Sequence, residues 1–535
     1  VQNSDISNNL GVASSDGSTS AGILVTTFFG AGSEATITGN VISGNTTAIA
    51  VGFDSSDTSV VNATMNDIVG NDFGVNSTQP QVNATVNWWG DESGPSGQGP
   101  GTGDSVSEFV SFCPWLDDSI SGAPVASGGA AVQNIDTGEY FCSIQEAIDD
   151  SDTVDGHTIE VDAGTFNEQV EVSKNIDLVG AGSNDTFLVS DATCTNQMNS
   201  SAIAGIRLVG DHSGISISGF NISGYDLGLD IGENIGRTIS NVSISDVNAS
   251  NNCVHGVLSQ AGDTDGVSIS NSTFNNNGSG FFAGRGLWFI NGTKSDISIT
   301  NSTFNNNRLV GIDISDGDVT GLTISDNTVI GNGDSGIGVL GPQGPDANLV
   351  SGNTVTDNGR FGIEIKNPDG MTTVSGNTVS LSGPGSDTRD YAGIAVFRRS
   401  PGATNADQPT GVTVSNNSVT GYVEPNGDGE GFGILIEGTN MVVTGNTMSG
   451  NDVGIQVQEG NPTPNTNGTD YFDRGDASAL ADATINNNDI TGNNVGVRAV
   501  GTTNVTDGTR NWWGDASGPS GQGPGTGDSV SEFVS

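Results

Sequence analysis

The sequence predicts an all-β protein built as a right-handed parallel β-helix, a solenoid in which the chain winds through stacked coils. Two observations lead to this prediction. A motif of about ten residues recurs along most of the 535-residue chain, and its apolar residues stand in short β-branched runs between Gly and Asn turns. Repeats that cannot bury an apolar face alone are typical of solenoids, because stacking gives them a shared core.

The motif is clearest in the second half of the chain, where its copies begin at intervals of 26, 24, 40, 29 and 42 residues. No amphipathic helix fits between the copies, which excludes β-α-β units. The two long intervals contain the insertions SGPGSDTRDYAG and EGNPTPNTNGTDYFDRGDASA, which we interpret as loops. The copies read TISDNTVIGN from residue 323, LVSGNTVTDN from 349, TVSGNTVSLS from 373, TVSNNSVTGY from 413, VVTGNTMSGN from 442 and TINNNDITGN from 484.

The apolar residues of each repeat are expected to lie in two short strands. Ile324 and Val329 flank a turn, and SGIGVL follows, in which Ile337 and Val339 alternate with small residues. Stacking such repeats about 4.8 Å apart gives every strand a parallel partner above and below.

Asparagine occupies one fixed place in the turn of the motif. Asn tolerates left-handed backbone, and its side chain can hydrogen-bond the Asn of the next coil. The pattern therefore predicts an internal ladder of asparagine side chains. Its predicted members are Asn40, Asn327, Asn353, Asn377, Asn417, Asn446 and Asn488.

These repeats resemble those of the pectate-lyase-like superfamily of parallel β-helices over nearly the whole chain. Such a resemblance implies a fold more than a chemistry. The segment SIQEAIDD predicts one helix at about residues 143–150, with Ser143 as N-cap and Glu146 three residues later. Its place before HTIEVDAGTFNEQVEV resembles the opening of pectin-esterase-type β-helices, which implies a helix that caps the open end of the first coil.

One phrase, NWWGDESGPSGQGPGTGDSVSEFVS, occupies residues 87–111 and returns at 511–535 with Ala516 in place of Glu92. Related repeats precede both copies. We therefore expect two β-helix units in tandem, within a window on a longer array. Residues 1–116 would be the C-terminal part of the first unit, 117–133 a linker, and 134–535 the second unit.

Two tryptophan pairs lie in this phrase, at the predicted last coil of each unit. Large apolar side chains there would cover the open core, a role we favour over a sugar-binding platform. The residues are Trp88, Trp89, Trp512 and Trp513.

The chain has four cysteines, Cys113, Cys142, Cys194 and Cys253. They show neither CxxC spacing nor a nearby His, which argues against a zinc site. An even count in a chain that we expect to be exported favours two disulfides over four buried thiols. Their proximity in sequence suggests the pairs Cys113 with Cys142 and Cys194 with Cys253.

The composition is strongly acidic, with 62 Asp and Glu against 14 Lys and Arg, a net charge of −48. This excludes nucleic acid as a natural partner, because a phosphate backbone requires a basic footprint. Abundant Asp with scarce Lys resembles halophilic archaeal proteins, since a salt-rich medium screens like charges. No apolar run approaches the roughly 20 residues of a membrane span.

The superfamily resemblance directs attention to polysaccharide chemistry. The polygalacturonase-like NTD, DD and GHG motifs and the pectin esterase motifs are missing from the sequence, and RFGIEIK at 360 is only a loose echo of RIK. A lyase requires a base and acidic calcium ligands. A weak candidate set on neighbouring coils comprises Arg308, Asp313, Arg360, Glu364 and Lys366, although an ordinary solvated face explains it better. We interpret His157, His212 and His255 as isolated polar turn residues.

Other short motifs are weaker. The turns DTDG at 263, DISDGD at 313 and NGDGEG at 426 offer oxygen ligands for calcium but match no known calcium loop, and RGD at 474–476 is expected by chance. Asn-x-Ser/Thr motifs are only slightly more frequent than chance. The candidate glycosylation sites are Asn45, Asn62, Asn76, Asn83, Asn221, Asn241, Asn271 and Asn301.

The sequence therefore predicts an extracellular structural protein of the cell surface, forming a layer, stalk or filament by association with itself or with neighbouring units. No complete catalytic motif is present, and calcium is the one candidate cofactor. The alternative is a β-helix that binds or cleaves polysaccharide, with surface glycans as partners. A groove with clustered aromatic residues, or an Arg and carboxylate set on one face, would distinguish it.

Overall fold

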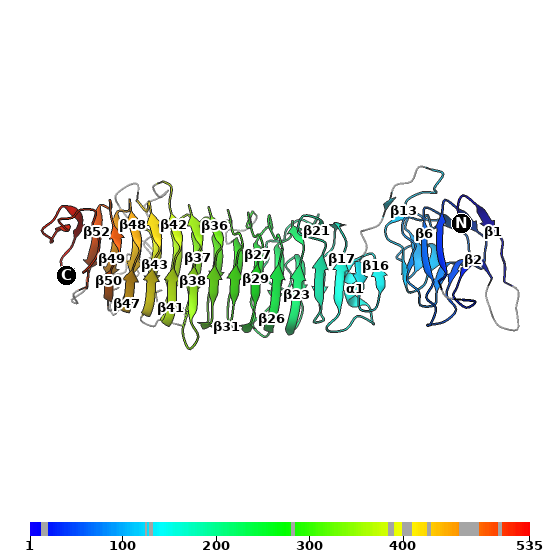
Figure 1. The fold of residues 1–535 in the computed structure, drawn as a ribbon, viewed down its shortest axis with the longest axis horizontal. Coiled ribbons are helices and arrows are strands. Elements are labelled where there is room, and N and C mark those ends of the chain that lie inside the picture. Colours follow the sequence, from blue (N-terminus) through cyan, green and yellow to red (C-terminus); the bar gives the residue numbers. More distant parts are fainter. Residues whose placement is uncertain are drawn as a thin grey trace. The chain divides into compact units, whose positions relative to one another are not determined.

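The computed structural model forms two compact units of stacked β-coils (Figure 1). Unit 1 comprises Val1–Leu188 with Ser218–Phe220, and unit 2 comprises Val189–Ile217 with Asn221–Ser535. The architecture confirms the predicted all-β parallel β-helix, whereas the tandem boundaries near residues 116 and 134 remain a prediction. The structure describes all residues except 12–19, 31, 123–125, 128–131, 280–283, 384–389, 399–408, 425–429, 459–480 and 501–505.

Unit 1 begins with three small parallel sheets. The first contains β1 (Asp5–Ser7), β4 (Val41–Ser43) and β7 (Asp67–Val69). The second contains β2 (Ala21–Val25), β5 (Thr47–Val51), β8 (Phe73–Ser77), β10 (Pro95–Gly97) and β11 (Gly103–Val106). The third contains β3 (Glu34–Thr38), β6 (Val60–Thr64), β9 (Val82–Asn83) and β12 (Val110–Ser111).

The rest of unit 1 contains the only helix among the described residues, α1 (Ile144–Asp149). The strands of this part are β13 (Trp115–Leu116), β14 (Ala126–Ser127), β15 (Val132–Asn134), β16 (Glu139–Phe141), β17 (Thr158–Val161), β18 (Gly164–Phe166), β19 (Val170–Val172), β20 (Asp177–Gly180) and β21 (Thr186–Val189).

Helix α1 begins as predicted, with Ser143 as its N-cap. The Ser143 hydroxyl accepts a hydrogen bond from the Glu146 N–H at 3.1 Å. A second cap was not predicted, because the Glu168 carboxylate accepts from the N–H groups of Ile144 and Gln145 at 3.0 Å each. Together these acceptors satisfy three of the N–H groups that a helix N-terminus leaves without intrahelical partners.

Unit 2 is a longer stack in which the chain visits three sheets in turn. The first contains β23 (His212–Ser218), β26 (Thr238–Ser245), β28 (Asp263–Asp265), β29 (Ser268–Ser270), β31 (Thr293–Ser295), β32 (Ser298–Thr300), β34 (Val319–Thr320), β35 (Thr323–Ser325), β38 (Asn348–Ser351), β41 (Asp369–Ser375), β44 (Thr410–Ser415), β47 (Gly438–Thr444) and β50 (Ala481–Asn486).

The other two sheets follow at successive turns. The second face contains β24 (Asn221–Ser223), β36 (Thr328–Ile330), β39 (Thr354–Thr356), β42 (Thr378–Ser380), β45 (Ser418–Thr420), β48 (Thr447–Ser449) and β51 (Asp489–Ile490). The third sheet contains β22 (Ala204–Leu208), β25 (Leu227–Gly232), β27 (His255–Ser259), β30 (Arg285–Phe289), β33 (Val310–Ile314), β37 (Ser335–Leu340), β40 (Phe361–Lys366), β43 (Tyr391–Phe397), β46 (Gly431–Ile436), β49 (Val453–Gln458), β52 (Val495–Val500), β53 (Pro519–Gly521) and β54 (Gly527–Val530).

Each coil therefore has three strands, not the two that the sequence predicts. Ile324 and Val329 flank a turn, as expected, but they lie on separate sheets, and SGIGVL forms the third strand, β37. Asp326, which lies between the two runs, has a positive φ of 58°, so the chain turns a corner there.

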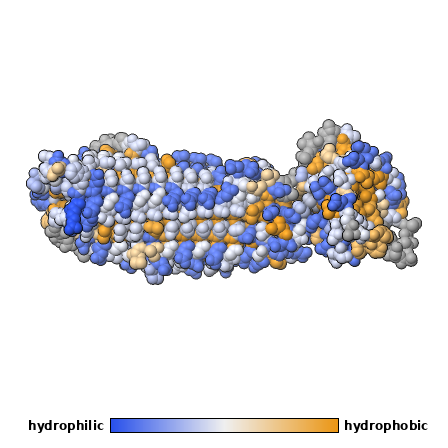
Figure 2. Space-filling view, viewed as in Figure 1, coloured by the Kyte–Doolittle hydropathy of each residue, from blue (hydrophilic) through white to orange (hydrophobic). Residues whose placement is uncertain are grey.

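The core consists of columns of like residues, one column for each sheet. Ile324 pairs with Val350, Val329 with Val355, and Ile337 with Ile363, and all six are buried. Figure 2 shows the same regularity outside, where residues of similar hydropathy form rows from coil to coil of unit 2.

The third sheet carries one glycine in almost every coil at a position where a side chain would not fit. A Cβ at Gly336 would lie 2.7 Å from the Gly362 carbonyl oxygen and 2.6 Å from Val355 Cγ1. The same clash with the glycine of the next coil recurs along the sheet, at Gly286, Gly311, Gly336, Gly362, Gly393, Gly433 and Gly454.

Candidate functional site

The candidate site is a cavity of about 220 Å³ on the outer side of the third sheet of unit 2. Trp288, Asp313, Gly338 and Glu364 follow one another in register on β30, β33, β37 and β40. Because alternate residues of a strand point to the same face, and like positions stack, these residues share one surface. Lys366, two residues after Glu364, lines the same cavity.

Gly338 leaves the space that the other side chains surround. A Cβ at this position would lie 3.4 Å from Lys366 Nζ and 3.6 Å from Asp313 Oδ1. Asp313 and Glu364 occupy this position on the neighbouring coils, so the glycine leaves a gap between two carboxylates.

Ion pairs hold both sides of the cavity. On one side, Arg285 Nε lies 2.7 Å from Asp313 Oδ2, and the guanidinium stands 3.9 Å from the ring centroid of Trp288. The indole N–H of Trp288 donates to Ser315 Oγ at 2.8 Å. These contacts fix the plane of a half-buried aromatic ring at the edge of the cavity.

On the other side, Lys366 Nζ lies 2.6 Å from Glu364 Oε2. The Ser335 hydroxyl donates to Glu364 Oε1 at 2.7 Å. Both oxygens of this carboxylate are therefore engaged, one by Lys366 and one by Ser335.

The structure brings together three of the five residues in the predicted candidate set: Asp313, Glu364 and Lys366. Arg308 is exposed and does not line the cavity. Arg360 is buried, donates to the Asp390 carbonyl at 2.9 Å and covers the ring of Phe361. Neither arginine joins the candidate set, because each lies in or beside the turn that precedes its strand and not on the outward row.

Sequence reasoning missed Arg285 and Trp288. The available signal was the alignment of RGLWF with VGIDI, SGIGVL and FGIEIK, which places Trp288 above Asp313, Gly338 and Glu364.

The three histidines lie in separate places, and two of them are not turn residues. His255 is fully buried in β27, where Nδ1 accepts from the Arg285 N–H at 3.1 Å. Burial, with the nearby Arg285 charge, lowers the pKa of His255 well below its usual value. His212 is buried at the start of β23, and only His157 lies in a turn, beside Asn134 at 3.1 Å.

The predicted asparagines form a ladder at the corner between the first and second sheets. In unit 2 each side-chain N–H donates to the amide oxygen of the next rung at 2.9 or 3.0 Å. The rungs are Asn327, Asn353, Asn377, Asn417, Asn446, Asn488 and Asn511. In unit 1, Asn40 donates to Asn66 and Asn66 to Asn87 in the same way.

A second ladder, not predicted, lies at the next corner. Its signal was a second Asn five residues after the first, as in Asn327 and Asn332. Two runs of side-chain amide contacts in unit 2 follow it, Asn277–Asn307–Asn332–Asn358 and Asn451–Asn493, together with Asn45–Asn71 in unit 1.

The repeated phrase closes both ladders, once in each unit. Its first residue, Asn87 or Asn511, is the last rung of the first ladder. Asp104 accepts from Asn71 at 2.6 Å, and Asp528 accepts from Asn493 at 2.9 Å. A carboxylate accepts without donating, so it satisfies the last amide and requires no further rung.

The tryptophan pairs of this phrase divide their roles. Trp89 is fully buried and Trp513 is 7% exposed, as a core cover requires. The prediction was wrong for the other two, since Trp512 is 49% exposed and Trp88 is only partly buried. Both continue the coil through backbone hydrogen bonds, with the Trp88 N–H donating to the Asn66 carbonyl at 2.9 Å.

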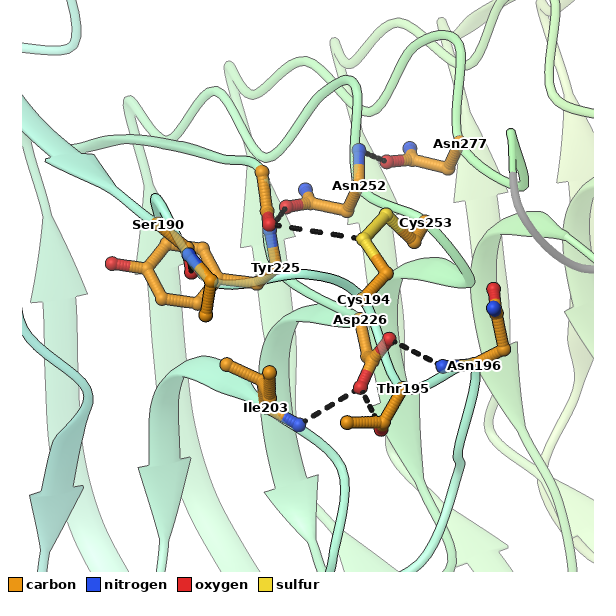
Figure 3. The surroundings of a disulfide bond; sticks show 12 residues. Ser190, Cys194, Thr195, Asn196, Ile203, Tyr225, Asp226, Asn252, Cys253 and Asn277 are labelled. Carbon is orange, nitrogen blue, oxygen red and sulfur yellow. Dashed lines mark hydrogen bonds between the residues drawn. A yellow bond between two sulfur atoms is a disulfide. The ribbon is translucent and has the colours of Figure 1, made fainter.

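The cysteines form the two pairs that the sequence suggests, Cys113–Cys142 and Cys194–Cys253. The second joins the loop before β22 to the bend that leads into β27 (Figure 3). Beside it, Asp226 accepts from the N–H groups of Asn196 at 2.8 Å and Ile203 at 3.0 Å. The loop thereby covers an apolar cluster that includes Leu227, Val254 and Leu258.

Two of the three turns considered for calcium use oxygens in contacts within the protein. Asp263 and Asp265 accept from the hydroxyls of Thr293 and Ser295 on the next coil. In DISDGD the Asp316 carbonyl accepts from buried Lys294 at 3.1 Å. NGDGEG lies largely, and RGD entirely, outside the described residues.

The candidate glycosylation sites differ in exposure. Asn45 is 1% exposed and its side-chain nitrogen belongs to the second ladder, so it is not accessible to a glycan in the folded unit. Asn76 and Asn221 are partly exposed. The exposed sites are Asn62, Asn83, Asn241, Asn271 and Asn301.

No helix within the described residues combines the length and hydropathy of a membrane span.

Comparison with known proteins gives one curated relative, a cell surface glycoprotein of Methanothermus fervidus. It is 37% identical over 100 residues, which are 18% of this chain and 16% of the relative. The A-module of the Azotobacter vinelandii mannuronan C-5 epimerase AlgE4 is 16% identical and superposes with a TM-score of 0.38 over 69% of this chain and 94% of its own. An alginate lyase from Paenibacillus sp. is 14% identical, with a TM-score of 0.36 over 58% and 93%.

The family model described as right handed beta helix region matches residues 195–345, 235–419 and 320–510. These matches span more than half of the 535 residues and contain the cavity, Cys253 of the disulfide in Figure 3 and most of both ladders in unit 2. The chain therefore belongs to the right-handed β-helix region family.

Proposed function

We propose that this chain is a structural protein of the cell surface, in which β-helix units form a rigid scaffold. The observation that carries this proposal is the repeated phrase, which closes the two asparagine ladders in unit 1 and again in unit 2. A segment that closes the ladders of a unit, and that occurs twice in one chain, suits a modular structural array, because each unit then covers the end of its own core.

Two further observations support a place outside the cell. Disulfides persist in oxidising compartments and are rare in cytosolic proteins, and this chain pairs all four of its cysteines. The relative from Methanothermus fervidus is a cell surface glycoprotein, although the similarity covers only 16% of its length.

The test is immunogold electron microscopy of source cells, with an antibody raised against unit 2, alongside negative-stain images of the purified full-length protein. We expect label along the cell boundary and elongated or assembled particles. Label confined to the cell interior, or compact isolated globules, would contradict the proposal.

A second candidate function is polysaccharide binding at the cavity beside Trp288. The supporting observation is an aromatic ring held between Arg285 and Ser315, next to two ion pairs. Sugar rings pack on indole faces, and Arg recognises uronate carboxylates in a bidentate manner. The net charge of −48 would repel acidic polysaccharides, so binding is expected only at high salt.

Calorimetric titration with acidic and neutral polysaccharides, in high salt with calcium, tests this candidate. Trp288→Ala should abolish binding, whereas Trp512→Ala removes a half-exposed tryptophan elsewhere in unit 2 and should not. Equal binding by the two variants would exclude this site, and unsaturated ends released by the wild type would show cleavage.

A further inference from the structure

Three carboxylates converge beside helix α1 in unit 1. Glu139 lies on β16, Asp150 is the C-cap of α1, and Asp152 follows two residues later. One carboxylate oxygen from each lies within 4.8 Å of the others. Within the described residues this is the one such group of three or more Asp, Glu, His or Cys side chains.

The surrounding backbone holds these residues in place. Strand β16 pairs with β15, which sets Glu139 opposite Asn134. Lys174 Nζ donates to the Asp150 carbonyl at 2.7 Å, and the Asp152 N–H donates to Asp150 Oδ1 at 2.8 Å. The lysine thus contacts backbone carbonyls of this turn.

Glu139 provides a separate indication of a missing partner. Its side chain is largely inaccessible, since the residue is 8% exposed, and Oε2 has no hydrogen-bond partner among the described residues. A buried carboxylate oxygen facing other carboxylates without a partner is costly unless a cation compensates it.

We propose that Glu139, Asp150 and Asp152 bind a calcium ion at the capping end of the second predicted β-helix. All the ligand atoms are oxygens, which suits a hard cation and excludes the Cys and His donors typical of zinc. A cavity of about 40 Å³ contacts all three side chains and is also lined by Glu108. Calcium accepts six to eight oxygens in irregular geometry, and this space holds about one water to extend the set.

Bound calcium would join β16 to the end of α1. Glu139 lies three residues before Cys142, which forms the disulfide with Cys113. The site would then stabilise the cap that covers the first coil. This inference is independent of the proposed function, because a scaffold and a polysaccharide-binding protein would both require the cap.

The first test is calorimetric titration of calcium alone into the metal-free full-length chain, in about 1 M NaCl to screen diffuse binding to the acidic surface. Wild type should bind with a dissociation constant in the range of about 10⁻⁴ to 10⁻³ M, as extracellular calcium modules do. Glu139→Gln and Asp152→Asn should weaken binding at least about tenfold, as expected for loss of a charged ligand.

The matched control is Glu160→Gln, which removes an exposed carboxylate from strand β17 of the same unit. It should bind as wild type does. If Glu139→Gln binds as tightly as Glu160→Gln, or if wild type shows no saturable binding, the proposal is overturned.

Thermal unfolding gives a second readout that does not depend on detecting heat of binding. Calcium should raise the melting temperature of wild type and Glu160→Gln but not of Glu139→Gln. Without calcium, Glu139→Gln should melt higher than wild type, because it removes an uncompensated buried charge. A Glu139→Gln protein that keeps the full calcium-dependent shift would contradict the site.

Discussion

Each ladder asparagine uses both ends of its side-chain amide, which explains why no other residue type replaces it in the later coils of unit 2. Asn377 accepts from the Asn353 N–H and donates to Asn417 Oδ1, each at 2.9 Å. It also donates to the Val350 carbonyl at 3.0 Å. Aspartate could not donate. Serine takes the same position at Ser302, where the hydroxyl accepts from the Ser272 N–H at 3.1 Å but donates to the Thr300 carbonyl of its own coil and not to the next rung.

Asn377→Ala should lower the free energy of unfolding of unit 2 by about 2–3 kcal/mol, because it leaves buried donors and acceptors of the adjacent rungs without partners. Denaturant unfolding followed by circular dichroism measures the change. The control Asn494→Ala removes an exposed amide and should cost less than about 0.5 kcal/mol. Equal effects would show that the ladder adds no stability.

Glu437 is a buried acid whose protonation should affect stability near neutral pH. It accepts from Gln458 Nε2 at 2.7 Å and from the Arg398 N–H at 2.9 Å. Burial raises its pKa from 4.5 to about 7. Between these values the folded state retains a proton that the unfolded state has released, so stability falls as pH rises through this window and levels off above it.

Glu437→Gln should remove this part of the pH dependence, about 3 kcal/mol between pH 4.5 and 7. The measurement is denaturant unfolding of wild type and variant at pH 5 and pH 7.5, compared as a difference so that other carboxylates cancel. The variant should gain over wild type only at the higher pH. An identical pH response in both proteins would contradict the assignment.

At the scale of elements, the close contact between coils limits which residue types fit in the third sheet, and it does so more strictly than strand propensity does. Glycine is normally unfavourable inside a strand, yet it recurs there because the next carbonyl oxygen leaves no room for a Cβ. The position is visible in the sequence as the Gly of SGIGVL and FGIEIK. The cause of this glycine is the close spacing of the coils, which only the structure shows.

Two glycines of β37 provide a matched pair. Gly336→Ala should destabilise unit 2 by several kcal/mol, since its Cβ would lie 2.7 Å from a backbone oxygen. Gly338→Ala, two residues later, points into the cavity and should change stability by less than about 1 kcal/mol. Melting temperatures of the two variants measure the contrast, and similar losses would contradict it.

The Cys194–Cys253 disulfide should stabilise the loop at 190–203 more than it stabilises the coils of unit 2. It spans 59 residues, for which chain entropy alone suggests a contribution of about 4 kcal/mol. Cys194→Ser with Cys253→Ser should increase amide hydrogen exchange in 190–203 and over Leu227 and Leu258, which that loop covers. Exchange that rises uniformly across unit 2, or does not rise at all, would contradict a local role.

For the whole molecule, the dominant quantity is a net charge of −48 on a fold with few basic residues. Raising the ionic strength from about 0.1 M to 1 M shortens the Debye length from about 10 Å to 3 Å and weakens repulsion between exposed carboxylates. The melting temperature should therefore rise with NaCl. Scanning calorimetry across this range measures it, and a flat or falling melting temperature would argue against adaptation to salt.

The sequence by itself determined the β-helix and the first asparagine ladder, because repetition exposes both features. The capping helix followed from Ser143 and Glu146 at capping-box spacing, and the cysteine pairs followed from their proximity in sequence. A residue that recurs in every coil must stack on its own copies, so its neighbours follow from the repeat. The third strand and the second ladder also lie within the repeated pattern, but we did not distinguish them from the two predicted strands and the first ladder.

Only the tertiary structure decided which residues meet where the repeat is broken. Gly338, Trp288 and Arg285 each occur once in their rows, so periodicity says nothing about the cavity they share. Glu139 and Asp152 lie outside the repeats, and a hairpin and a helix end bring their carboxylates together. The repeat predicts only the contacts that are common to all coils. A site consists of residues that differ from the repeat, and their contacts depend on the folded chain.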